Sequence, residues 1–198
     1  KYHNFKVMLL FYNIKKGYKI MLYSFDKKLL GFCENKKIKS FPLYIFSDLK
    51  YLDSTDLVNV EQKRFLKSAF DLEKDNFGFF PDKNGSLAGA IIIIRALKEP
   101  KKSIIDQAAK LSKKLPNKKW ETNFVSMFED NDKYNFFLGW GLSFYNFSIE
   151  GKKENLTKSR TLCSRQAKIV ISKVLLEKCF AEIRGIFLTR DLINLPPN

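Results

Sequence analysis

Apolar and polar positions along this chain follow two patterns, one typical of strands and one typical of helices. Short apolar runs indicate strands at Phe41–Phe46, Trp120–Phe128 and Arg160–Cys163. Two further runs, Phe77–Phe80 and Ser86–Ile94, flank a turn that contains Asn-Gly, and together they predict a β-hairpin. The second run ends in consecutive isoleucines without alternation, as expected of a strand that is covered on both faces.

Helical spacing of apolar residues predicts helices at Asp56–Phe70, at Ser103–Leu115 before Pro116, and at Asp132–Tyr145. The glycines inside the last of these weaken the helix prediction, because glycine is a poor helix former. In the first helix we expect one buried face, made of Leu57, Val60, Phe65, Leu66 and Ala69.

The longest predicted helix runs from Arg165 to about Asn194. At 1.5 Å per residue, its roughly 28 residues would span about 40 Å, which is longer than a small domain needs. We interpret it as a strut between two domains, with apolar positions at Ile171, Val174, Leu175, Ile183, Ile186, Phe187 and Leu188. Strands interleaved with helices predict a layered α/β sandwich.

Length and composition favour a globular protein. The chain has 198 residues, of which 45% are hydrophobic, so it can hold one domain and part of another. No apolar run approaches the ~20 residues that a bilayer requires. Val7–Ile14 resembles a signal peptide only faintly, because it lacks a small-residue cleavage site and Lys15-Lys16 follow it. We therefore expect a cytoplasmic protein that has no contact with a membrane.

The first 25 residues are predicted to be a leader outside the fold. Residue 1 is Lys, which is not a start residue, and Met21 or Met8 is the expected true start. Residues 1–25 are therefore excluded from fold reasoning in the way that a tag is excluded.

Cysteine and histidine usage argues against a disulfide framework and against histidine chemistry. The three cysteines, Cys33, Cys163 and Cys179, are odd in number and have no Cys-x-x-Cys spacing, which suits reduced thiols. The only histidine is His3, in the predicted leader. A histidine-ligated metal or a histidine-dependent nucleophile is not expected in this chain.

The formal net charge of +15 raises the question of nucleic-acid binding. Only six of the 36 basic residues are arginine, the better bidentate ligand of bases and phosphates. The basic residues come as scattered doublets, such as Lys27-Lys28 and Lys113-Lys114, and do not form one block. A solvated surface is the favoured interpretation, and weak association with polyanions stays open.

Two acidic segments suggest metal binding at first sight. Counted from Asp71, a calcium-binding EF-hand loop needs Gly at the sixth place and Glu at the twelfth, where this chain has Asn76 and Asp82. A solvated helix end is therefore preferred for Asp71–Asn76. Glu129–Asp132 lies just before a predicted helix, where acidic residues cap the positive end, and this interpretation is preferred over a metal site.

A glycine-containing segment and an aromatic cluster are the remaining candidates. Gly85–Gly89 lacks the Lys-Ser/Thr of a phosphate-binding loop and the third glycine of a dinucleotide fingerprint, so its glycines are assigned to a turn and to close packing. A set of aromatic residues could stack nucleobases, but its spacing of three and four favours a buried helix stripe. These residues are Trp140, Phe144, Tyr145 and Phe147.

The C-terminal segment carries a family resemblance. Arg190–Asn194 followed by Pro196-Pro197-Asn198 resembles the Arg-Asp-Leu-(Val/Ile)-Asn-x-Pro-(Pro/Ala)-Asn segment of the leucyl aminopeptidase (cytosol aminopeptidase) family. In that family the segment lies where a domain-linking helix enters the catalytic domain. A Pro-Pro pair cannot continue a helix, which agrees with a boundary at this point. The resemblance therefore assigns interdomain contacts to Arg190, Asp191, Asn194, Pro196, Pro197 and Asn198.

Two upstream segments match the same family in the same order. Leu138–Phe147 is similar to its Leu-Gly-Trp-Ala-Leu-Gly-Ala-Tyr-Arg-Phe stretch, and Gly85–Ala90 is similar to its Gly-x-Leu-Ala-Gly-(Ala/Val) strand entry. The resemblance covers roughly residues 60–198. It breaks after Tyr145, where the family often continues Arg-Phe-Asp-Arg-Tyr-Lys and this chain has Asn146 and the residues up to Glu150.

The resemblance implies a macro-domain-like mixed sheet flanked by helices, followed by a long interdomain helix. It places an N-terminal α/β domain at residues 26–163, and the linker helix with the first residues of a catalytic domain at residues 164–198. In the family, two divalent metal ions, manganese or zinc, bind in the catalytic domain within motifs such as Asn-Thr-Asp-Ala-Glu-Gly-Arg-Leu. That motif does not occur in this sequence, so we expect no catalytic, metal-binding or substrate-binding residue here. The expected partners are the catalytic domain, further copies in a hexamer, and peptide substrates.

Three hypotheses follow for the function. The first is the non-catalytic N-terminal part of a leucyl-aminopeptidase-type metallopeptidase, truncated before its active site, so that the 198-residue chain alone is inactive. The alternative is a stand-alone basic α/β module that binds nucleic acid or an anionic nucleotide. A third is a degenerate gene product without a selected function.

Overall fold

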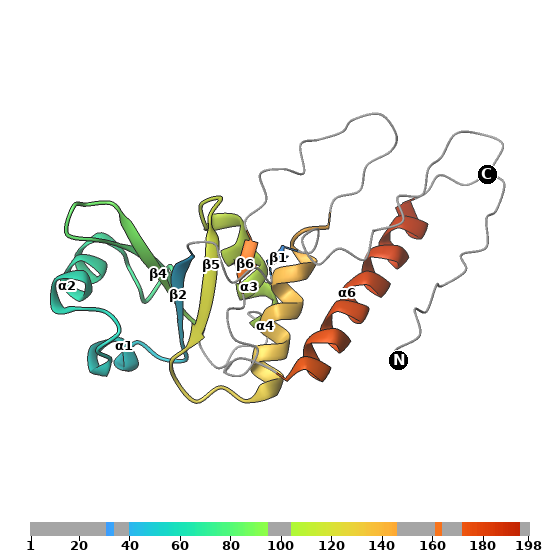
Figure 1. Ribbon diagram of the computed structural model, residues 1–198, viewed down its shortest axis with the longest axis horizontal. Coiled ribbons are helices and arrows are strands. Elements are labelled where there is room, and N and C mark those ends of the chain that lie inside the picture. The colour runs from blue at the N-terminus through green and yellow to red at the C-terminus, as the bar shows by residue number, and fades with distance from the viewer. Residues whose placement is uncertain (1–30, 34–39, 95–103, 146–160, 164–171, 195–198) are drawn as a thin grey trace.

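The computed structural model describes residues 31–33, 40–94, 104–145, 161–163 and 172–194, and these form one α/β sheet structure with helices on both faces (Figure 1). The predicted leader, His3, Phe147 and Pro196 to Asn198 lie outside these residues. The elements are β1 (Phe32–Cys33), β2 (Phe41–Phe46), α1 (Lys50–Ser54), α2 (Val60–Ala69), β3 (Phe77–Pro81), β4 (Leu87–Ile93), α3 (Ile104–Lys114), β5 (Lys119–Phe124), α4 (Asp130–Leu142), β6 (Thr161–Cys163) and α6 (Lys173–Asn194).

The described strands form a six-stranded mixed sheet in the order β1-β6-β5-β2-β4-β3. All neighbouring strands pair in parallel except β3 and β4, which pair antiparallel and form the predicted hairpin. The carboxylate of Asp82 accepts the backbone N–H groups of Asn84 and Ser86 at 2.8 and 2.9 Å, and Gly85 has a φ of 76°. This left-handed conformation explains why a glycine stands in the turn. The predicted α/β fold, with a mixed sheet, flanking helices and a long helix after it, is confirmed.

The isoleucine run of β4 supplies both faces of the sheet. Ala90, Ile92 and Ile94 belong to the larger core, while Ile91 and Ile93 belong to a smaller core on the opposite face, and all five are at most 3% exposed. Side chains of successive strand residues point to opposite faces, so a strand without alternation must be covered on both sides. The prediction made from the sequence for this strand is confirmed.

The two faces carry different helices. On one face, Leu52 of α1 and Leu66 of α2 complete the smaller core. On the other face, α3 and α4 cover the sheet, and α6 lies beyond α4, on the side away from the central strands (Figure 1). Four buried residues of α6, namely Cys179, Phe180, Ile183 and Phe187, enter the larger core.

The helix predicted at Asp56–Phe70 is shorter and faces differently than expected. It begins at Val60, because Asn59 and Gln62 form a reciprocal capping box at its N-terminus. Of the predicted buried face only Leu66 is buried, while Leu57, Val60 and Phe65 are 51, 63 and 42% exposed, so this part of the prediction is wrong. Val58 and Leu72, which were not among the five residues of the predicted face, belong to the smaller core instead. Helix α1 was not predicted.

Two glycines of α4 have a packing role that helical propensity does not reveal. A Cβ atom at Gly139 would lie 2.1 Å from the backbone oxygen of Ile105 in α3, and one at Gly141 would lie 2.3 Å from Cδ1 of Ile183 in α6. The Ile105 atoms belong to the backbone, so α3 approaches α4 closely only because position 139 is glycine, whereas a side chain at position 141 would displace the end of the Ile183 side chain. The helix predicted at Asp132–Tyr145 therefore exists, as Asp130–Leu142, in spite of its glycines.

The strand predicted at Trp120–Phe128 ends earlier, at Phe124, and the short strand predicted at Arg160–Cys163 is present as β6. Helix α6 has 22 residues, about 33 Å at 1.5 Å per residue, and Ser172 caps its first turn by accepting the N–H of Leu175. The predicted start at Arg165 and Ile171 lie outside the described residues. Two of the apolar positions noted in the sequence of this helix, Val174 and Leu188, are exposed.

Candidate interdomain site at the end of helix α6

Tyr145, just after α4, is the residue on which the C-terminal turns of α6 meet the domain. Its ring packs against Phe187, with ring centroids 5.2 Å apart at an interplanar angle of 58°. The guanidinium carbon of Arg190 lies 5.2 Å from the centroid of the same ring. The side-chain amide of Asn194 donates to the tyrosine hydroxyl at 3.1 Å. Packing, a cation–π contact and a hydrogen bond thus converge on one side chain.

The three α6 residues reach Tyr145 because of their spacing. Phe187, Arg190 and Asn194 are three and four positions apart, which places them in one row along a helix. Tyr145 lies two residues after Ser143, the C-cap residue of α4, whose N–H bonds to the carbonyl of Gly139. The two segments that carry the family resemblance, Leu138–Phe147 and Arg190–Asn198, therefore contact each other, through Tyr145 of the first and Arg190 and Asn194 of the second.

A second contact holds α6 to α4 near its N-terminal half. The hydroxyl of Tyr134 donates to the carboxylate of Glu182, and Nζ of Lys178 lies 5.7 Å from the centroid of the Tyr134 ring. Burial, followed by the hydrogen bond and the charge of Glu182, raises the pKa of Tyr134 above its ordinary value. The two contacts lie at opposite parts of α6, so they fix its direction along α4.

Cys179 lies between Lys178 and Glu182 in the sequence and is fully buried. Burial, with a smaller contribution from the charge of Glu182, raises the pKa of its thiol to about 12. The thiolate is the reactive form, so this cysteine is a packing residue and not a nucleophile.

Comparison with protein-family models finds no match, and comparison with curated proteins also finds none. Among solved structures, the chain is similar to the 1.8 Å crystal structure of the cytosol aminopeptidase from Coxiella burnetii, with a TM-score of 0.61 and 20% sequence identity. The chain has a leucyl aminopeptidase-like fold. The match covers 83% of this chain but 33% of the aminopeptidase chain, so it spans about a third of that protein.

Within this aminopeptidase-like fold, the described residues contain no group of three or more side chains that could hold a metal ion. The acidic segment at Glu129–Asp132 forms a capping box at the start of α4, as predicted. Asp71 accepts the N–H of Lys74 and closes a turn after α2. Both are local backbone interactions.

The other sequence candidates also have packing roles. A Cβ atom at Gly89 would meet Phe80 at 2.3 Å and Pro42 at 2.9 Å, so this glycine allows close packing. Trp140 is fully buried and its indole N–H donates to the carbonyl of Gly31, which confirms a buried helix position for this aromatic residue. Phe144 packs on Trp140 with ring centroids 5.9 Å apart.

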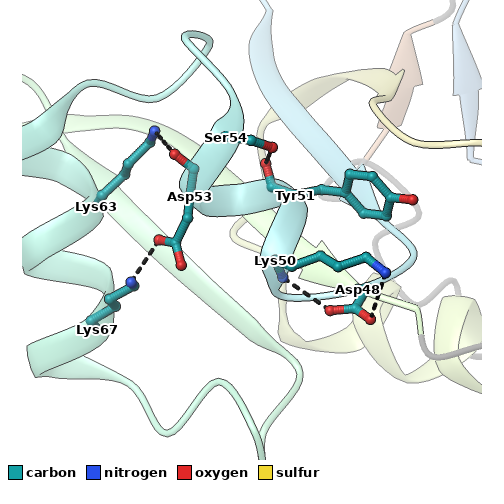
Figure 2. Close-up of polar contacts among 7 residues, drawn as sticks. All are labelled: Asp48, Lys50, Tyr51, Asp53, Ser54, Lys63 and Lys67. Atoms are coloured by element: carbon teal, nitrogen blue, oxygen red, sulfur yellow. Dashed lines mark hydrogen bonds and ion pairs between the residues drawn. The ribbon is translucent and has the colours of Figure 1, made fainter.

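Figure 2 shows how several surface lysines are used at the junction of α1 and α2. Asp53 of α1 pairs with Lys67 at 2.6 Å, and its backbone carbonyl accepts Nζ of Lys63 at 2.8 Å. Asp48 and Lys50 form a further pair at 3.7 Å. The two contacts of Asp53 link α1 to α2, the Asp48–Lys50 pair is local to the start of α1, and all three use part of the basic surface.

The structure places the interdomain residues of the sequence analysis as follows. Arg190 and Asn194 lie side by side on Tyr145, both largely exposed to solvent. The backbone of Asp191 lies in α6, and the remaining three, Pro196, Pro197 and Asn198, are outside the described residues. Sequence reasoning did not find the role of Tyr145 and Phe187 as their contact partners, although the spacing of Phe187, Arg190 and Asn194 carried that signal. Among the described residues, no helix is long and apolar enough to cross a membrane.

Proposed function

We propose that this chain is the non-catalytic N-terminal part of a leucyl-aminopeptidase-type metallopeptidase. The observation that carries the proposal is the fold match to one third of a cytosol aminopeptidase, over most of the length of this chain. It is supported by the meeting of two family-like segments at Tyr145. The removal of N-terminal residues from peptides would be performed by a catalytic domain on the polypeptide beyond this chain.

The role of these residues is mechanical. Helix α6 is held along α4 by its buried side chains and by the contacts at Tyr134 and Tyr145. The C-terminal end of α6, at Asn194, therefore has a fixed place and direction relative to α4. Pro196-Pro197 cannot continue the helix, so this is where a following domain would begin.

The metal chemistry belongs to that other domain in this proposal. Two divalent ions, manganese or zinc, would supply an activated hydroxide and a grip on the substrate, as paired metals do in hydrolases. The domain limits at 26–163 and 164–198, the leader at 1–25, the hexamer and the cytoplasmic location are further parts of the proposal.

The test compares two proteins, the complete product of the gene and the chain of 198 residues. Each is purified and assayed for hydrolysis of leucine p-nitroanilide with manganese or zinc. The expected result is turnover by a longer gene product and none by the 198-residue chain. Turnover that follows the purified 198-residue chain, or a longer product without any, contradicts the proposal.

A further inference from the structure

Helix α6 carries apolar residues on two faces, and only one face is covered by the domain. Cys179, Phe180, Ile183 and Phe187 form the buried face and are at most 1% exposed. On the other face, Val174 is 79%, Leu188 is 43% and Leu192 is 55% exposed, and Ile193 beside them is 76% exposed. A helix at a protein surface usually has a polar outer face, whereas a helix that is apolar all round is covered all round.

The exposed residues follow one line along the helix. Val174, Lys178, Ala181, Gly185, Leu188 and Leu192 are alternately four and three positions apart, and all are exposed. This is the spacing by which one helix keeps a continuous seam against a neighbouring element. We call this set the outer seam of α6.

Gly185 lies in the middle of the outer seam, and no contact within the domain requires a glycine there. A Cβ atom at Gly185 would meet nothing within 4 Å, unlike the glycines of α4, which are crowded by α3 and α6. Glycine in the middle of a helix is unfavourable compared with alanine, so its presence here calls for a packing reason. Close approach of another element from outside supplies such a reason.

We propose that the outer seam of α6 is the surface on which the catalytic domain docks. This inference rests on the proposed function, because the occupant is the polypeptide that makes up the part of the aminopeptidase not matched by this chain. The apolar residues of the seam are densest at its C-terminal end, at Leu188 and Leu192, which is the end of α6 that the proposed function joins to the catalytic domain. A domain tethered at that point reaches this surface before any other exposed apolar residues of the described fold, such as those of α2 (Figure 1).

The experiment measures the accessibility of a cysteine placed in the seam. Leu192→Cys is compared with Val60→Cys, an equally exposed apolar position on α2, on the opposite face of the sheet. Each variant is made in the 198-residue chain and in the complete gene product, and labelling by a maleimide is followed peptide by peptide. Peptide resolution keeps the native cysteines from interfering, and Leu188→Cys repeats the test one helical turn away.

The expected result is that Cys at position 192 is labelled at least about tenfold more slowly in the complete product than in the 198-residue chain, since the centre of an interface excludes solvent. Position 60 should be labelled at the same rate in both. Equal labelling at position 192 in a longer product that cleaves leucine p-nitroanilide overturns the docking surface and leaves the proposed function standing. Protection in a longer product that does not cleave supports the docking surface, while the proposed function fails.

Two other outcomes also overturn the docking surface. Protection that appears in the 198-residue chain itself and grows with protein concentration assigns the seam to a second copy. A mature gene product that ends at Asn198 removes the proposed occupant altogether.

Discussion

Arg190 lies over the ring of Tyr145, with its guanidinium carbon 5.2 Å from the ring centroid. The same tyrosine accepts a hydrogen bond from Asn194 and packs on Phe187, so one side chain after α4 holds the last two turns of α6. The C-terminal end of α6 is therefore held against the end of α4 through this one residue.

The hydroxyl and the ring of Tyr145 contribute separately. Tyr145→Phe keeps the ring and removes the hydroxyl that accepts from Asn194, and we expect it to lower the free energy of unfolding by about 0.5–1 kcal/mol. Tyr145→Ala also removes the contacts with Phe187 and Arg190, and the expected loss is roughly 2–3 kcal/mol because the ring is half-buried. Urea unfolding of both variants measures the difference. Equal losses would show that the ring contacts contribute nothing.

The glycines of α4 and α6 should respond in opposite ways to alanine. Gly139→Ala would place Cβ 2.1 Å from the backbone oxygen of Ile105, so α3 and α4 must separate, with an expected loss of roughly 2–4 kcal/mol. Gly185→Ala meets no atom within 4 Å and should stabilise the 198-residue chain by about 0.5–1 kcal/mol through helix propensity. Thermal unfolding of the pair is the measurement, and a destabilised Gly185→Ala variant of this chain would be against the description of the outer seam.

The buried thiol of Cys179 makes stability depend on alkaline pH. Burial raises its pKa from 9.0 to about 12, so the folded protein keeps a proton that the unfolded chain loses above pH 9. The stabilising contribution is complete below that pH and is lost as the pH rises towards 12. We expect the free energy of unfolding to fall less steeply between pH 8 and pH 10 in Cys179→Ala than in the parent chain. The comparison of slopes, by urea unfolding, is independent of the cavity that alanine leaves, and identical slopes would contradict it.

The ion pair at Asp53 should matter far less than the leucine beside it. The side chains of Asp53 and Lys67 are both at least half exposed, and such pairs contribute about 0–1 kcal/mol. Leu52 is fully buried in the smaller core, and Leu52→Ala should cost roughly 2–5 kcal/mol. Asp53→Ala and Leu52→Ala are compared by urea unfolding at low and high salt. If Asp53→Ala lowered the free energy of unfolding as much as Leu52→Ala does, the ion pair drawn in Figure 2 would contribute far more than an exposed pair should.

The sequence was sufficient for elements whose pattern is local. The isoleucines of β4 and the turn before them specify a hairpin and a doubly covered strand, and the structure has both. The face of α2 could not be predicted in the same way, because Leu57, Val60 and Phe65 have helical spacing and yet remain largely exposed. Whether an apolar stripe is buried depends on the elements around it and not on its own period.

The candidate site shows the same division. The residues Arg190 and Asn194 were found through a motif, yet their partner Tyr145 was interpreted only as part of a buried stripe. Contacts between positions so distant in sequence depend on how α4 and α6 pack against each other, for example where Gly141 faces Ile183. A helical spacing describes one helix at a time, so it could not reveal the pairing.

The natural protein itself can show whether these residues are the non-catalytic part of a two-domain aminopeptidase, as we propose. Its C-terminal sequence can be determined by mass spectrometry of peptides from the protein isolated from its cells. We expect peptides that continue past Asn198 into a second domain with a motif of the Asn-Thr-Asp-Ala-Glu-Gly-Arg-Leu type. A natural protein whose last residue is Asn198, or a continuation without such a motif, would contradict it.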